Sequence, residues 1–304
     1  MKNKILFTLM ILIVSGLFLS CQFFSKVVDV SAQVAGATGV VNQNTANAIS
    51  TSAKAIGTAA EEITPEQEYY IGRAVAANIL RSYRLWNGNA ALTTYLNNIC
   101  MAITINSPRP EIFNGYRVAI LDSNEINAFA TSGGHIFITR GLINATRSED
   151  ALAGVIAHEV AHIQLMHGIK AIKNSRITQA LLITGTASVG AATGMNVNQL
   201  TEVFNETVGE IVQTMVNSGY SQSQEFEADN TAMALMASAG YNPNGLITML
   251  RALSNVQTSG SGFGKTHPTP QRRITNAERT VANHARNVTD TSRSREARFT
   301  AATR

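Results

Sequence analysis

The stretch that most constrains this chain is the H-E-x-x-H sequence between Ala157 and Ile163. On an α-helix, residues four apart project from one face, so His158 and His162 can place two imidazole nitrogens on one metal ion, with Glu159 beside them. Two neutral imidazoles suit Zn²⁺, and an adjacent carboxylate can take a proton from a water at an open coordination position. The motif therefore predicts one zinc ion per chain, with His158 and His162 as ligands and Glu159 as general base.

The flanking residues predict a buried helix around this motif. Thr146-Arg147-Ser148-Glu149 is typical of a capping box, and acidic residues occupy the first turn. An apolar pattern continues through Ala151, Leu152, Val155, Ile156, Ala161 and Ile163.

Length and composition limit the class of protein. The 304 residues suffice for one catalytic domain with appendages. With 45% hydrophobic and only 14% charged residues, the chain suits a protein held at a membrane. The net charge is +4, and the sequence has no long basic run with interleaved aromatics. We therefore do not expect nucleic acid as a partner.

The N-terminus predicts export from the cytoplasm. Lys2 and Lys4 precede an apolar run from Ile5 to Leu19, as in a signal peptide covering residues 1–20. Residues 17–21 resemble a bacterial lipobox, which makes Cys21 the lipid-anchored first residue of the mature chain; an ordinary cleaved signal and an uncleaved anchor are the alternatives. Gln22 resembles an outer-membrane sorting signal. We therefore expect a periplasmic lipoprotein, in which Cys100 has no intramolecular disulfide partner.

Three further regions follow from the composition after the signal peptide. Residues 21–62 form a lipidated, low-complexity tether, residues 63–280 the folded domain, and residues 281–304 a polar tail whose end we expect to be poorly ordered. Thr64 and Pro65 predict the start of a helix, and a second helix follows the turn at residues 87–89. The uncharged stretch from Ile177 to Thr201 is expected to be a lid over the site or a hairpin that contacts the membrane.

A small sheet is expected before the motif helix. Residues 116–121 and 136–139 alternate as strands do, residues 127–131 suggest a short strand between them, and Gly133-Gly134 can make the turn. Such a sheet offers an edge to which an extended peptide can add as a strand, or it covers one side of the helix.

The third ligand must come from a later helix. His167 lies five residues beyond His162 and is expected to be a packing or capping residue instead. Glu225 and Asp229 are four apart on one helix face, whereas Glu227 turns away. We expect Glu225 to bind the metal and Asp229 to accept the ring N–H of a zinc histidine. The alternative for this acidic pair is a solvated helix face.

Together these motifs resemble the HtpX-like and CAAX-prenyl-protease-like zinc metallopeptidases, which are gluzincins. Besides the H-E-x-x-H sequence with Glu225-x-x-Ala228-Asp229, the resemblance covers residues 127–142, 149–150, 266–268 and 273–274. It implies an α+β, mostly helical fold with a small sheet beside the motif helix. It also implies an endopeptidase that cleaves misfolded or unassembled envelope proteins near the outer-membrane assembly machinery.

The resemblance extends to further site residues. It implies that Arg273 supports the ligands and that His267 lies at the active site, where it stabilises the oxyanion or occupies the open zinc position at rest; His267-Pro268 can also be a simple turn. Contact with an extended or unfolded polypeptide is implied for six residues: Asn127, Ala128, Phe129, Gly133, Gly134 and Ile136.

Two positions depart from the family pattern. Tyr220-Ser221-Gln222 lacks the arginine that family members often carry there, so a supporting cation is missing or comes from elsewhere, and His135 replaces an aromatic or aliphatic residue. The ligands and Glu159 are intact, so we expect an active enzyme. The alternatives are a non-catalytic, chaperone-like lipoprotein that binds client proteins, and an enzyme kept latent by its lid.

Overall fold

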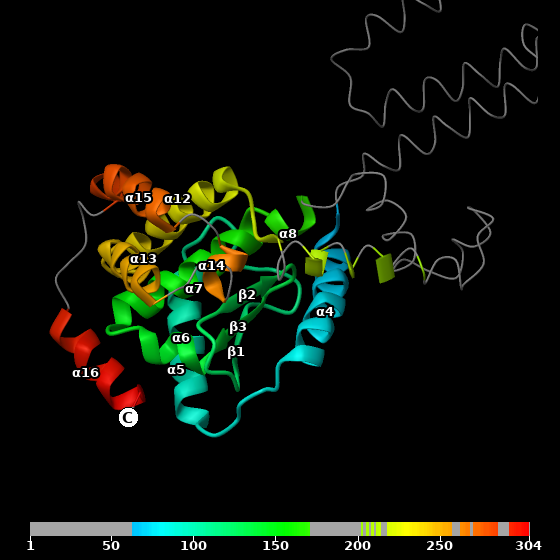
Figure 1. Ribbon diagram of the computed structural model, residues 1–304, viewed down its shortest axis with the longest axis horizontal. Coiled ribbons are helices and arrows are strands. Elements are labelled where there is room, and N and C mark those ends of the chain that lie inside the picture. The colour runs from blue at the N-terminus through cyan, green and yellow to red at the C-terminus, as the bar shows by residue number, and fades with distance from the viewer. Residues whose placement is uncertain are drawn as a thin grey trace, which may run out of the picture. The chain divides into compact units, whose positions relative to one another are not determined.

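The computed structural model describes residues 63–170, 218–256, 262–267, 270–284 and 292–303, with a few positions between 202 and 213. This part of the chain is a mostly helical α+β domain with one small mixed sheet (Figure 1). The expectations for the signal peptide, the lipidated tether and the segment from Ile177 to Thr201 lie outside the described residues.

The motif helix α7 (Glu149–Gln164) lies at the centre of the domain. Its residues 151–163 are all buried, because other elements cover it on several sides. It packs against α5 (Ala90–Thr104), α12 (Gln222–Ser238) and α13 (Asn244–Val256), and against the sheet. A helix enclosed in this way holds its polar side chains in fixed positions.

The start of α7 differs from the expected capping box. Ser148 is the N-cap and its hydroxyl accepts a hydrogen bond from the Ala151 N–H at 3.2 Å. Thr146 instead ends the preceding helix α6 (Arg140–Ala145). The carboxylate of Glu149 is also unavailable for a box, because it accepts hydrogen bonds from Tyr95 and Arg298.

The sheet has the strand order β1-β3-β2. β1 (Arg117–Leu121) runs parallel to β3 (His135–Thr139), and β2 (Ala128–Thr131) runs antiparallel to it, with Phe129 opposite Phe137. β3 is therefore the middle strand, and its backbone is paired on both sides. Strand addition along Ile136 is excluded by this pairing, which corrects the expected role of that residue. Among the described residues, β2 pairs only with β3.

The Gly133-Gly134 turn is shaped by packing. Both residues have positive φ, at 79° and 97°. A Cβ at Gly133 would lie 2.4 Å from Cα of Tyr69 on α4 (Pro65–Ser82), and one at Gly134 would lie 2.4 Å from the Gly115 carbonyl oxygen. Backbone packing thus accounts for both glycines, without the substrate contact that we expected. Thr64 caps α4 with Pro65 at its first position, as expected.

The C-terminal region is more ordered than expected. After the short α8 (His167–Lys170), α12 and α13, the chain forms α14 (Phe263–Thr266), α15 (Pro270–His284) and α16 (Ser292–Thr303). α16 packs against α5 and α7. Arg295 donates to Asp150 at 3.1 Å and Arg298 to Glu149 at 2.6 Å. The expectation of a poorly ordered end is wrong for residues 292–303, because these arginines bind the acidic first turn of α7.

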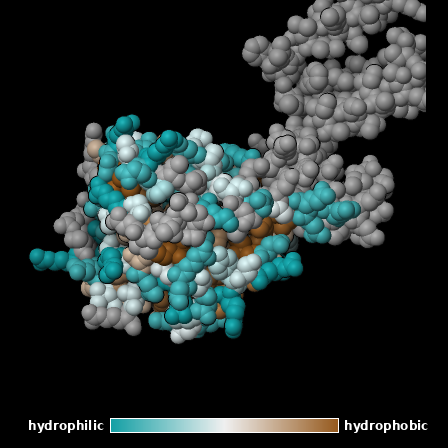
Figure 2. All heavy atoms as spheres, in the orientation of Figure 1, coloured by the Kyte–Doolittle hydropathy of each residue, from teal (hydrophilic) through white to brown (hydrophobic). Residues whose placement is uncertain are grey.

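On the face shown in Figure 2, hydrophilic residues cover most of the described surface, and hydrophobic residues appear between them in limited strips. No helix within the described ranges has both the length and the apolar character needed to cross a bilayer.

Candidate metal centre

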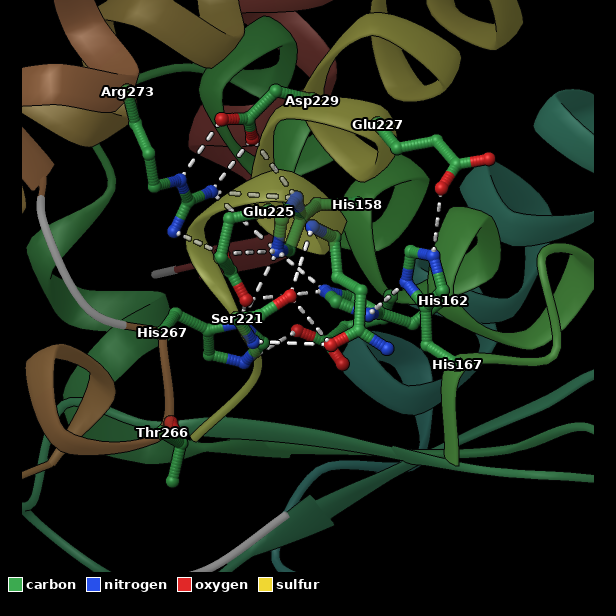
Figure 3. Close-up of polar contacts among 12 residues, drawn as sticks. His158, His162, His167, Ser221, Glu225, Glu227, Asp229, Thr266, His267 and Arg273 are labelled. Carbon is green, nitrogen blue, oxygen red and sulfur yellow. Dashed lines mark hydrogen bonds and ion pairs between the residues drawn. The ribbon is translucent and has the colours of Figure 1, made fainter. Parts of the chain in front are cut away.

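Four side chains from three parts of the chain meet above α7. His158 and His162 come from α7, Glu225 from the first turn of α12, and His267 from the residue that follows α14. One ligand atom from each lies within 4.8 Å of the others, and all four residues are buried. Figure 3 shows these side chains directed toward one another. The structure thus brings the three expected ligands together and adds His267 to them.

The distances suit a single small cation. Nε2 of His162 lies 3.0 Å from Nε2 of His158, which in turn lies 3.2 Å from Nδ1 of His267. Tetrahedral zinc with bonds of about 2.0–2.1 Å to nitrogen places its ligand atoms roughly 3.3 Å apart. Burial, followed by the charge of His158, holds the pKa of His162 well below its ordinary value, which leaves that ring neutral for coordination.

Glu225 is placed by the capping box that starts α12. Ser221 is the N-cap and forms the box with Gln224, the residue just before Glu225. The Glu225 carboxylate therefore projects from the first turn toward the histidines. Its Oε2 lies 2.8 Å from Nη1 of Arg273. Burial raises the pKa of Glu225, but the charges of Arg273 and His267 outweigh burial and hold the pKa well below its ordinary value. Arg273 thus supplies a buried cation next to this ligand.

Asp229 lies one turn further along α12 and reaches the far side of the His158 ring. Its Oδ1 is 3.0 Å from Nδ1 of His158, and Arg273 donates to both carboxylate oxygens, at 2.6 and 2.8 Å. Burial and Arg273 oppose protonation of His158, but the hydrogen bonds that its ring donates to Asp229 and Glu225 outweigh them and raise its pKa to about 9. Arg273 is fully buried between the two carboxylates, so it faces the ligands and not an incoming peptide.

Glu159 projects from α7 next to the ligand cluster. It is 1% exposed, and its Oε1 has no hydrogen-bond partner among the described residues. Nε2 of His267 lies 3.5 Å from that oxygen. Burial raises the pKa of Glu159 above its ordinary value, which makes the carboxylate a better proton acceptor.

His267 is held from two sides. Its ring stacks on Phe263 with centroids 4.2 Å apart, and its Nδ1 lies 3.1 Å from Oε1 of Glu225. The preceding Thr266 donates to the Asn127 side chain at 3.1 Å. Asn127 is 2% exposed and also accepts a hydrogen bond from the Ala128 N–H. Its side chain therefore fixes the loop that carries His267, where we expected substrate contact.

Sequence reasoning missed two aromatic neighbours of His162. Tyr220 stacks on the His162 ring with centroids 4.1 Å apart at 19°. His167 is buried, and its Nδ1 lies 2.9 Å from Nδ1 of His162. His167 lies outside the ligand cluster, as expected, but it contacts a ligand instead of pointing away from it. Its place just beyond the end of α7, where residues 165–166 leave the helix, could not be obtained from helical periodicity.

The donor set fits zinc. Three imidazoles and a carboxylate are the nitrogen and oxygen donors that zinc takes in proteins. Oε1 of Glu159 is buried without a hydrogen bond from a described side chain, whereas Oε2 of Glu225 has the ion pair with Arg273 at 2.8 Å. Buried carboxylate oxygens of this kind are costly unless a cation or water satisfies them.

Comparisons with known proteins agree with this geometry. The chain is 26% identical over 229 residues to the beta-barrel assembly-enhancing protease of Escherichia coli, an alignment that covers 72% of this chain and 45% of the relative. It is 29% identical over 135 residues to the metalloprotease LoiP of E. coli, covering 44% and 50% of the two chains. The mitochondrial metalloendopeptidase OMA1 of Schizosaccharomyces pombe is 28% identical over 159 residues, covering 50% and 42%.

A family model also matches the chain. The chain spans about half the length of the curated relatives it matches. Residues 90–281 match peptidase family M48, and this range contains α7, α12 and the residue His267. By this match over more than half of its length, the chain belongs to peptidase family M48.

Proposed function

We propose that this chain is a zinc-dependent endopeptidase. The observation that carries the proposal is the convergence of His158, His162 and Glu225 beside the buried carboxylate of Glu159, whose Oε1 has no hydrogen-bond partner in the described part of the chain. A purely structural zinc site needs no such carboxylate. Membership of a peptidase family and the presence of Glu159 both favour catalysis over a chaperone-like binding role.

We assign His158, His162 and Glu225 to the metal and Glu159 to proton transfer. Zinc, when bound, polarises a water and the peptide carbonyl. Glu159 accepts the proton of the attacking water and later returns it to the leaving amine, and its raised pKa suits both steps. Asp229 and Arg273 hold His158 and Glu225 in place during these transfers.

The edge of β2 is our candidate for the backbone of an extended polypeptide. β2 includes Ala128 and Phe129, and it packs against α7. Side chains of β2 are buried, so substrate contact through this strand depends on backbone hydrogen bonds, as in strand addition. This assignment favours unfolded or extended substrates over folded ones.

We assign His267 to the fourth metal position in the resting enzyme. Its Nδ1 lies 3.2 Å from Nε2 of His158 and 3.1 Å from Oε1 of Glu225. Four protein ligands leave no open position for a water. His267 therefore has to move aside before catalysis. We assign stabilisation of the oxyanion to the displaced ring.

The cellular setting is also a proposal. One relative is named a beta-barrel assembly-enhancing protease, which supports misfolded or unassembled envelope proteins as substrates and the outer-membrane assembly machinery as a partner. The N-terminal sequence supports residence in the bacterial periplasm, with Cys21 as a lipid anchor in the outer membrane.

Proteolysis of an unfolded substrate tests the proposal. The full chain in detergent should cleave casein, lose that activity to a zinc chelator, and regain it when stoichiometric zinc is returned. The His162→Ala variant is the matched negative control. Binding of casein without cleavage, in a chain that holds one zinc, would support the chaperone-like alternative and sink the endopeptidase proposal.

A further inference from the structure

His162 binds its neighbours through both ring nitrogens. Its Nε2 faces the ligand cluster, 3.0 Å from Nε2 of His158 and 3.6 Å from Oε1 of Glu225. Its Nδ1 faces the opposite way, 2.9 Å from Nδ1 of His167. If Nε2 gives its lone pair to the metal, the ring hydrogen must sit on Nδ1, which makes His162 the donor to His167.

The contact between two Nδ1 atoms then determines the tautomer of His167. Because Nδ1 of His167 has to accept the hydrogen, its own hydrogen sits on Nε2. That nitrogen lies 3.3 Å from Oε2 of Glu227, a carboxylate that can only accept. Figure 3 shows Glu227, His167 and His162 in this order, leading toward the cluster. Each donor in the series has one acceptor, and no group receives two hydrogens.

We propose that His167 and Glu227 are positioning residues for the zinc site, and that they act through His162 as a donor relay from the metal ligand to the surface. This proposal rests on the proposed zinc site. Glu227 was expected to turn away from the ligands, and it does. It nevertheless reaches His162 indirectly, because His167 lies between them.

The two histidines of the motif are thus supported in different ways. His158 contacts the carboxylate of Asp229 directly, and this carboxylate is fully buried. His162 is connected through a second imidazole to Glu227, whose side chain is 54% exposed. Water competes for an exposed acceptor, so the His162 branch gives weaker support than the His158 branch. The exposure also allows Glu227 to be changed without disturbing the core.

Zinc affinity is the direct readout. Competition with a chromogenic chelator measures it in the full chain, independently of proteolysis. We expect His167→Ala to weaken zinc binding by about 10–100-fold, and Glu227→Ala by roughly 3–10-fold because its carboxylate is partly solvated. Glu227→Gln keeps an acceptor oxygen and should restore affinity to within about twofold of the parent. The melting temperature of the metal-free Glu227→Ala chain should match that of the parent.

A double-mutant cycle separates a relay from independent effects. In His167→Asn the side-chain oxygen still accepts from His162, but the connection to Glu227 is cut, so Glu227→Ala should have no further effect in that background. Glu278→Ala removes a similarly exposed carboxylate, paired with Arg251 at 2.6 Å, and should leave zinc affinity unchanged.

The outcomes distinguish this inference from the function on which it rests. A parent chain that binds no zinc refutes the proposed zinc site. A parent that binds zinc, together with Glu227→Ala and His167→Ala variants that bind it equally tightly, overturns the relay and leaves the site intact. Equal losses from Glu227→Ala in the parent and His167→Asn backgrounds also contradict the relay, because the effect of Glu227 then bypasses His167.

Discussion

Asp229 and His158 are joined by a contact of 3.0 Å between Oδ1 and Nδ1, on the side of the ring that faces away from the ligand cluster. When the ring is neutral, its hydrogen sits on Nδ1 and is donated to Asp229, so Nε2 carries no hydrogen and faces Glu225, His162 and His267. Arg273 holds the carboxylate in place. The orientation of a metal ligand is therefore determined by two residues that are not ligands themselves.

Removal of this contact should weaken zinc binding. We expect Asp229→Ala to lower zinc affinity by about 10–100-fold, as is usual for carboxylates that support a metal-binding histidine. Chelator competition checks the value, and Asp122→Ala, which removes a surface carboxylate paired with Arg140, is the control. Unchanged affinity in Asp229→Ala would show that His158 needs no support from α12.

Arg273 should matter most when zinc is absent. The guanidinium is fully buried between Glu225 and Asp229, so Arg273→Met leaves two buried carboxylates without the cation that bridges them. We expect a loss of about 3–5 kcal/mol in the unfolding free energy of the metal-free chain, and a smaller loss with zinc present, since zinc compensates Glu225. Urea unfolding with and without zinc tests this. Arg272→Met, an exposed neighbour, should have little effect. A loss of the same size in both states would contradict the account.

Zinc binding should release a proton from His158. In the metal-free chain the pKa of His158 is raised to about 9, so the ring is protonated at pH 7 and the proton competes with zinc. Apparent zinc affinity should therefore rise about tenfold per pH unit between pH 7 and 9 and level off above that. Titrations corrected for the chelator's own protonation measure the slope. A flat profile over this range would mean that His158 is already neutral at pH 7.

The contact of α16 with α7 should contribute modestly to stability. Arg298 donates to Glu149 through Nη2 and Nε, at 2.6 and 3.1 Å, and Glu149 is 1% exposed. Arg298 itself is 54% exposed, so water screens the pair and Arg298→Ala should cost only about 1 kcal/mol. Thermal unfolding compares it with Arg293→Ala on the exposed side of α16. Equal stability of the two variants would mean that Arg298 does not hold α16 in place.

Local patterns in the sequence predicted much of this structure. The three strands, the cap of α4, and the approach of Glu225 and Asp229 to the motif histidines follow from periodicities of two and of four residues and from the chemistry of metal ligands. The mostly helical α+β fold agrees with membership of peptidase family M48.

Contacts between distant segments were harder to predict. The order of the strands decides that β3 is central, and no local pattern reports that order. The roles of Gly133 and Asn127 depend on α4 and on Thr266, which lie far away in the sequence. The polar composition of residues 292–303 is typical of a disordered tail, but its arginines find partners in the acidic first turn of α7.

The central claim is that Glu159 transfers the proton at a zinc site built from His158, His162 and Glu225. The Glu159→Gln variant tests it most directly, because the amide keeps the shape of the side chain but cannot accept the proton of the attacking water. We measure zinc content and casein cleavage on the same preparation. The account predicts one zinc per chain and a rate at least about 100-fold below the parent. Cleavage at the parental rate by a zinc-loaded Glu159→Gln chain would contradict it.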